Sequence, residues 1–179
     1  MYEYLDRRYA LAIYEVAEKK GKVDEYLNDL RTICDVIENN KNFQQVIRHP
    51  HVNTTKKKQL FTDIFKGNID DELLSFMIIL IEKNRILYLK EKLDQMEKID
   101  LERKNIMKGI VKTAIPLLPE ELEKLKTIFE EKYDKTIIFD TQVDRTILGG
   151  VYVSIGNDVI DGTIKSKIEE MKEIMLKKE

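Results

Sequence analysis

The stretch that decides the fold of the second half of this chain is Leu148-Gly149-Gly150-Val151-Tyr152-Val153-Ser154-Ile155-Gly156-Asn157-Asp158-Val159-Ile160-Asp161-Gly162-Thr163-Ile164. Within it, Val151, Val153 and Ile155 occupy alternate positions, which predicts a β-strand with one buried face. The tripeptide 156–158 contains residues that tolerate a positive φ angle, so it predicts a tight turn. The apolar pair 159–160 then begins a short return strand, and the stretch predicts a β-hairpin.

The glycines of this stretch indicate backbone shape and not ligand binding. Gly149 and Gly150 let the chain bend sharply where a side chain would obstruct. Asp161 is placed to cap a following helix, with Gly162 in a conformation that other residues resist. The spacing of these glycines with Gly156 matches neither a Walker loop nor a dinucleotide-binding loop. Phosphate binding is therefore not predicted.

The residues on either side of this stretch predict a small α/β unit. Residues 110–115 and 136–143 are rich in β-branched residues and predict two more strands. Pro119 suits the first position of a helix between them. A last amphipathic helix follows the hairpin. Its apolar positions are Ile164, Ile168, Met171, Ile174 and Met175.

The first half of the chain shows helical periodicity throughout. Apolar residues recur three and four positions apart from Leu5 onward, and Gly21, Pro50 and Gly67 mark helix ends. The texture changes near residue 105, where glycine, proline and β-branched residues become frequent. The predicted fold is mostly α: an N-terminal six-helix bundle over residues 1–105, then a small α/β C-terminal domain with a β-hairpin over residues 106–179.

One helix of the predicted bundle stands out by its composition. Asp70 is a favourable N-cap, and acidic residues follow it in the first turn. The body from Leu73 to Ile81 is apolar on nearly every side, which predicts a helix buried at the centre of the bundle.

Composition and charge exclude several classes of protein. Lys and Arg number 31 against 33 Asp and Glu, and the net charge of −2 does not indicate a nucleic-acid partner. A helical RNA-associated adaptor, or another adaptor module, stays the main alternative. The longest apolar run falls far short of the roughly 20 residues that cross a bilayer. The N-terminus lacks the features of a signal peptide, so we expect contact with a membrane only through partners.

Residues that could carry chemistry are few. Cys34, the single cysteine, lies on an apolar helix face and is expected to be a buried, inert thiol. His49 and His51 flank Pro50, but a zinc site needs a third and usually a fourth ligand. A small hydrolase that uses Cys34 with a histidine is a second alternative. We expect no enzymatic activity, no metal and no cofactor.

Four stretches together resemble the delta subunit family of F-type ATP synthases, whose mitochondrial counterpart is the oligomycin-sensitivity-conferring subunit. Residues 148–164 look like the family's C-terminal signature. Residues 8–14 resemble its opening helix, residues 49–61 its mid-domain motif, and residues 76–85 fall at the expected place. The resemblance covers essentially the whole chain.

This resemblance implies a non-catalytic stator subunit of the peripheral stalk. The family's N-terminal bundle binds the N-terminal helix of an alpha subunit, and its C-terminal part binds the C-terminal ends of the membrane-anchored b subunits, so that rotation drives ATP synthesis. The implied location is the cytoplasmic face of a bacterial cell membrane. Carried onto this chain, the first helix and the central helix each form one wall of the alpha-helix groove. The expected residues are Tyr9, Ala12, Ile13, Leu73, Phe76, Met77 and Leu80.

Three departures from the family pattern affect local geometry, of which Thr163, where many relatives have serine, is a mild change. Leu118 stands where many relatives have a polar N-cap residue, and leucine is a poor N-cap. Asn84 stands where many relatives have glycine, and asparagine tolerates the left-handed backbone conformation that a turn there needs.

Overall fold

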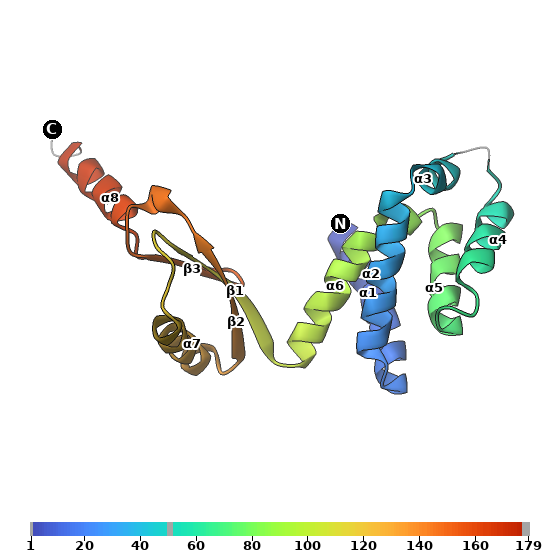
Figure 1. The fold of residues 1–179 in the computed structure, drawn as a ribbon, viewed down its shortest axis with the longest axis horizontal. Helices are drawn as coiled ribbons and strands as arrows, with labels where there is room; N and C mark the ends of the chain where they lie inside the picture. The colour runs from blue at the N-terminus through green and yellow to red at the C-terminus, as the bar shows by residue number, and fades with distance from the viewer. Residues whose placement is uncertain (1, 50–51, 177–179) are drawn as a thin grey trace. The chain divides into compact units, whose positions relative to one another are not determined.

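The computed structural model describes residues 2–49 and 52–176 (Figure 1). By their internal contacts the residues form two compact units, Met1–Asp100 and Leu101–Glu179. Each unit is described by itself below.

The first unit is a helical bundle with one continuous core. Its helices, with the short 3-10 helix η1, are α1 (Tyr2–Lys20), α2 (Val23–Asn39), α3 (Lys41–Arg48), α4 (Thr54–Phe65), α5 (Asp71–Glu82), η1 (Ile86–Tyr88) and α6 (Leu89–Arg103). Every one of these elements contributes buried apolar side chains to a single cluster. The predicted six-helix bundle is therefore confirmed, although the last predicted helix begins with a turn of 3-10 geometry.

The helix ends follow the capping residues that the sequence supplies. Gly21 takes a φ of +66° after α1, where a side chain would be strained. Asn53 accepts a hydrogen bond from the Thr55 amide at the start of α4. Asn84 adopts a φ of +55° after α5, so it takes the left-handed conformation that was expected for this turn.

The prediction that α5 is buried on nearly every side is wrong at one face. Leu73, Met77 and Leu80 are fully buried, as expected for a central helix. Ile79, however, is 46% exposed. The neighbouring elements cover most of α5 but leave one edge open, and hydrophobicity alone does not show which edge that is.

The second unit is a four-stranded sheet with two helices. Its elements, with the 3-10 helix η2, are β1 (Ile106–Thr113), α7 (Pro119–Tyr133), β2 (Thr136–Val143), η2 (Arg145–Ile147), β3 (Val151–Ile155), β4 (Asp158–Asp161) and α8 (Ile164–Leu176). The strand order is β2-β1-β3-β4, with β1 parallel to β2 and antiparallel to β3. Strands β3 and β4 form the predicted hairpin. Strand β1 begins four residues earlier than the sequence suggested, because its register with β2 starts at Ile106.

Helix α7 covers one face of this sheet and completes the second core (Figure 1). Phe129 of α7 packs against a core formed by Ile137, Val111, Val153 and Ile155. The start of α7 has no side-chain acceptor at Leu118; instead the Leu118 amide donates to the carboxylate of Glu121 at 3.0 Å. This bond is the half of a capping box that the third helical residue supplies, and the half that a polar N-cap side chain would supply is missing.

The beginning of α8 differs in detail from the prediction. Asp161 was expected to cap this helix, but Thr163 is the residue directly before it, and its Oγ1 accepts the Ser166 amide at 3.2 Å. Asp161 instead accepts the Thr163 amide at 2.9 Å and so orders the turn that leads into the cap. Gly162 does not take a positive φ angle. A Cβ there would lie 3.2 Å from the Val151 carbonyl oxygen, so close packing is its constraint.

Candidate functional site

Helices α1 and α5 lie against each other in opposite directions. At one end, Lys20 near the end of α1 forms ion pairs with Asp70 and Glu72 at the start of α5. Further along, the rings of Tyr9 and Phe76 meet edge to face with their centroids 6.4 Å apart. Tyr9 lies before Lys20 in sequence and Phe76 lies after Asp70, so the two contacts fix an antiparallel pair.

Tyr9 is held by polar contacts as well as by packing. The Arg85 Nη1 group donates a hydrogen bond to the Tyr9 hydroxyl at 3.1 Å. The Arg85 guanidinium carbon also lies 5.3 Å from the centre of the Tyr9 ring, within cation–π range. Tyr9 is thereby held by both Phe76 and Arg85, and it is half-buried.

An accessible strip follows this helix pair. On α5, Ile79 lies three positions after Phe76, on the edge of the helix where Phe76 meets Tyr9 of α1. The exposed Lys83 follows directly after the end of α5. On α1, a hollow of about 320 Å³ is lined by Leu5, Arg8, Tyr9 and Ala12. We call the surface formed by Leu5, Tyr9, Ala12 and Ile79 the α1/α5 surface, and the buried Phe76 supports it from beneath. It offers apolar side chains at a helix–helix junction, which suits an amphipathic helix.

The residues predicted for the alpha-helix groove fall into two groups in this structure. Ala12 is exposed and Tyr9 is half-buried, so both can be reached from outside. The other predicted residues are buried in the first core, where they support the surface from beneath. They are Ile13, Leu73, Phe76, Met77 and Leu80. Sequence reasoning missed Leu5 and Ile79. The three-residue spacing puts Ile79 on the same edge of α5 as Phe76. That spacing points to the surface only when it is known that Phe76 packs against Tyr9 of α1.

A second, deeper pocket of about 540 Å³ adjoins this surface, because Leu5 lines both. At its inner wall, Lys92 is only 2% exposed. The Lys92 Nζ donates to the Asp6 carboxylate and to the Tyr88 carbonyl oxygen, each at 2.8 Å. Lys83 and Arg85 also line the pocket.

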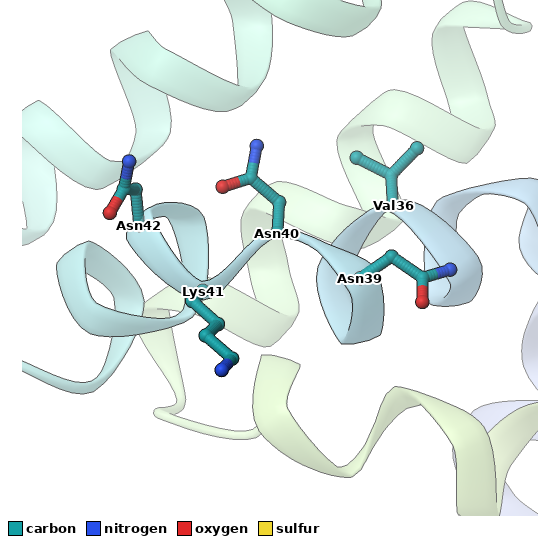
Figure 2. Close-up of a pocket in the computed structure, with 5 residues that line it drawn as sticks. All are labelled: Val36, Asn39, Asn40, Lys41 and Asn42. Atoms are coloured by element: carbon teal, nitrogen blue, oxygen red, sulfur yellow. The ribbon is translucent and has the colours of Figure 1, made fainter.

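A shallower depression of about 510 Å³ lies where α2 meets α3 and offers little chemistry. Figure 2 shows Val36, Asn40 and Asn42 projecting to one side of the backbone and Lys41 to the other. The Asn40 side chain already caps α3, since its carbonyl oxygen accepts the Phe43 amide at 3.0 Å. The depression is therefore a by-product of the helix junction.

The residues considered for catalysis do not come together. Cys34 is buried as expected, and burial raises the pKa of its thiol to about 12. His49 follows the last residue of α3, and His51 lies outside the described residues. Across residues 2–49 and 52–176, no group of three His, Cys, Asp or Glu side chains could hold a metal ion.

The second unit leaves one helix face uncovered. None of the described residues of α8 is buried. Its apolar side chains are between 47% and 67% exposed. They are Ile164, Ile168, Met171, Ile174, Met175 and Leu176. Within the described part of the chain, no helix has the length and apolar character to span a bilayer.

Two folded units that each keep apolar helix surface accessible fit one class of protein, the structural adaptor. Comparison with known proteins gives the family. The sequence profile described as ATP synthase delta (OSCP) subunit matches residues 5–175. An ATP synthase subunit delta of Clostridium beijerinckii is 71% identical over 179 residues and covers all of both chains, and one of Clostridium perfringens is 58% identical over the same length. The chain belongs to the ATP synthase delta (OSCP) subunit family.

A solved structure agrees with this at the level of the fold. A chain in the mitochondrial ATP synthase hexamer of Toxoplasma gondii matches 96% of this chain with a TM-score of 0.61. The match covers 97% of that chain at 16% sequence identity, so it shows the fold alone. Family membership makes this chain a structural subunit and a peripheral-stalk component of an ATP synthase, as the sequence resemblance predicted. The RNA-associated alternative is not favoured.

Proposed function

We propose that this chain is the stator link between the catalytic head and the membrane-anchored part of a bacterial ATP synthase. Its helical bundle binds the N-terminal helix of an alpha subunit, and its α/β unit binds the C-terminal ends of the b subunits. The link prevents the head from turning with the rotor, so that rotation drives ATP synthesis. The chain itself does no chemistry, and it reaches the cytoplasmic face of the cell membrane only through these partners.

The observation that carries this proposal is the match of the family profile over residues 5–175, with relatives that cover the chain from end to end. Both units are therefore present in one chain, as a link between two partners requires. We also propose that residues 1–105 and 106–179 are the two binding domains, each with its own partner.

The α1/α5 surface supports the bundle as the alpha-binding part. Tyr9 is fixed by Phe76 and Arg85 before any partner arrives, so little side-chain freedom remains to be lost there on binding. Ile79 and Ala12 are accessible beside it. A large rigid ring next to a small residue is a surface that a helix can approach closely.

Titration of the full-length chain with a synthetic peptide of the cognate alpha-subunit N-terminus tests this contact. Ala12→Arg puts a long cation into the apolar strip, and we expect affinity to fall by more than about tenfold, which corresponds to about 1.4 kcal/mol. Asn28→Arg adds the same side chain at an exposed position of α2 and serves as the matched control. Equal affinity of both variants would remove α1 from the alpha-binding site.

The uncovered face of α8 supports the α/β unit as the b-binding part. Ile164, Ile168, Met171 and Met175 recur at spacings of three and four, so they form one apolar stripe along the helix. A stripe of this kind packs against another amphipathic helix.

The variant Ile168→Asp tests this second contact. Because Ile168 is exposed, the substitution is expected to leave the stability of the free chain within about 0.5 kcal/mol of the native value. Co-purification with the cognate b subunits is expected to fail. Glu169→Asp at the next exposed position is the control. Retention of b by Ile168→Asp would assign b to another surface.

The absence of chemistry has its own test. The purified chain is expected to hydrolyse ATP no faster than a mock preparation, whereas the complete ATP synthase is expected to couple hydrolysis to ion transport only with this subunit bound. Turnover by the pure chain would overturn the stator assignment.

A further inference from the structure

The pocket that adjoins the α1/α5 surface carries more charge than its own residues neutralise. It is lined by α1, by the segment that follows α5, and by the first turn of α6. We propose that this pocket is a carboxylate-binding site, which takes one acidic side chain from the alpha-subunit helix and fixes the register of that helix on the α1/α5 surface. The inference rests on the proposed function, since it concerns the same partner.

At the inner wall of the pocket, the positive charge of Lys92 is neutralised and its side chain is held in place. Lys92 is almost fully buried, and its ammonium group is held by the carboxylate of Asp6 and by the Tyr88 carbonyl oxygen. The ammonium also lies 5.9 Å from the ring centres of both Tyr9 and Tyr88. This network fixes the shape of the pocket. Because Lys92 is already paired, a ligand would be bound by the groups at the rim.

The rim is cationic. Lys83 and Arg85 line the pocket, and neither forms an ion pair with any carboxylate in the part of the chain that the structure describes. Glu91 is the one lining acid besides Asp6, so three cationic side chains face two carboxylates. Arg8, in the hollow next to it, adds to the excess of positive charge.

Arg85 has the geometry that favours a carboxylate over a neutral group. Its guanidinium has five N–H donors in a plane, and one of them is used by the Tyr9 hydroxyl. The remaining donors suit the two oxygens of a carboxylate. Tyr88, which also lines the pocket, is 55% exposed, and its ring can cover the methylene groups of a glutamate.

The two ends of the α1/α5 surface differ in charge, which orients a helix lying on it. The end at Lys20 has no excess of positive charge, because two carboxylates, those of Asp70 and Glu72, pair with that lysine. The other end opens through Leu5 into the cationic pocket. Charge complementarity therefore places an acidic residue of the bound helix at the pocket, while its apolar face covers Tyr9 and Ile79.

The test uses the full-length chain and a series of alpha N-terminal peptides in which each acidic residue is replaced singly by its amide. We expect one replacement to weaken binding to the native chain by about fivefold, the upper range for an exposed ion pair. Lys83→Gln is expected to weaken the native peptide by a similar factor. On Lys83→Gln, that one amide peptide should show a smaller loss than on the native chain, because only Arg85 still contacts the native carboxylate. Lys98→Gln, an exposed lysine of α6, is the control and should bind like the native chain.

The outcomes separate this inference from the proposed function. Binding that is the same for every amide peptide, or losses that simply add on Lys83→Gln, would overturn the carboxylate site and leave the alpha contact standing. Failure of the native peptide to bind would overturn both.

Discussion

The backbone at Gly150 passes so close to the carbonyl group of Gly162 that a Cβ at position 150 would lie 2.2 Å from that oxygen. Gly150 also takes a φ of +80°, which L-residues rarely adopt. Two backbone hydrogen bonds of 2.9 Å, from Gly162 to Val151 and from Ile164 to Gly149, join the same segments. The start of β3 and the start of α8 are thus fastened backbone to backbone.

Gly150→Ala is expected to destabilise this junction severely. The positive φ angle alone costs about 1 to 2 kcal/mol for an alanine, and the clash adds to it because both partners are backbone. Gly21→Ala is the matched control, since its φ is +66° but nothing lies within 4 Å of its Cβ position. Hydrogen exchange of the β3 and α8 amides measures the loss for Gly150→Ala, and exchange of the α1 and α2 amides measures the loss for Gly21→Ala. Equal losses at the two positions would show that the close approach carries no energy.

Asp70 joins three elements of the first unit. Its Oδ1 accepts from the Tyr26 hydroxyl at 2.8 Å, from Lys20 at 2.9 Å and from the Glu72 amide at 3.1 Å. The hydrogen bonds from Lys20 and then Tyr26 hold the pKa of this carboxyl below its ordinary value of 3.8. Burial, then the Asp70 hydrogen bond, raises the pKa of the fully buried Tyr26.

Asp70→Asn is expected to lower the free energy of unfolding at pH 7 by about 1 to 2 kcal/mol, because charge-assisted bonds become neutral ones. Since the folded pKa of Asp70 is depressed, its contribution is complete above the ordinary value of 3.8 and is lost as the pH falls through the folded pKa. Urea unfolding between pH 7 and pH 3 should therefore show the gap between native and variant shrinking. Asp71→Asn is the control at the neighbouring exposed position, and a gap that widened on acidification would contradict the assignment.

Cys34 should behave as an inert core residue. With a pKa raised to about 12 by burial, only about one thiol in ten thousand is ionised at pH 8, and the thiolate is the reactive form. A thiol reagent such as iodoacetamide is expected to leave the native chain unmodified at pH 8 and to label it fully in urea. Rapid labelling of the native chain would revive the hydrolase alternative.

Local signals predicted the elements of this fold well, because capping and turn residues act on their own neighbours. The structure has helix ends at the predicted positions, namely Gly21, Asn53 and Asp70. The hairpin was likewise predicted from residues 151–160 and is present. The candidate site was harder to predict from the sequence, because it depends on which helices are neighbours in the folded chain. Lys92 and Asp6 are separated by 86 positions, and no periodicity connects them.

Surface exposure was the other property that the sequence could not supply. The apolar stripe of α8 has the spacing of a buried face, yet none of its described residues is buried within this chain. Ile79 likewise has the character of a core residue and lies at an open edge of α5. A periodic apolar pattern predicts that a face is covered by something, and it does not tell an internal neighbour from a partner protein.

The buried pair of Lys92 and Asp6 gives a prediction about how two mutations combine. Asp6→Ala leaves the Lys92 ammonium buried without its carboxylate, and we expect a loss of about 3 kcal/mol in the free energy of unfolding. Lys92→Met keeps an apolar stem of similar length and removes the charge, while Asp6, which is more exposed, can be solvated. It should cost less than Asp6→Ala. The double variant should be more stable than Asp6→Ala alone, because no buried charge remains unpaired. Urea unfolding of the four proteins measures the cycle, and simple additivity of the two losses would show that the pair is not coupled.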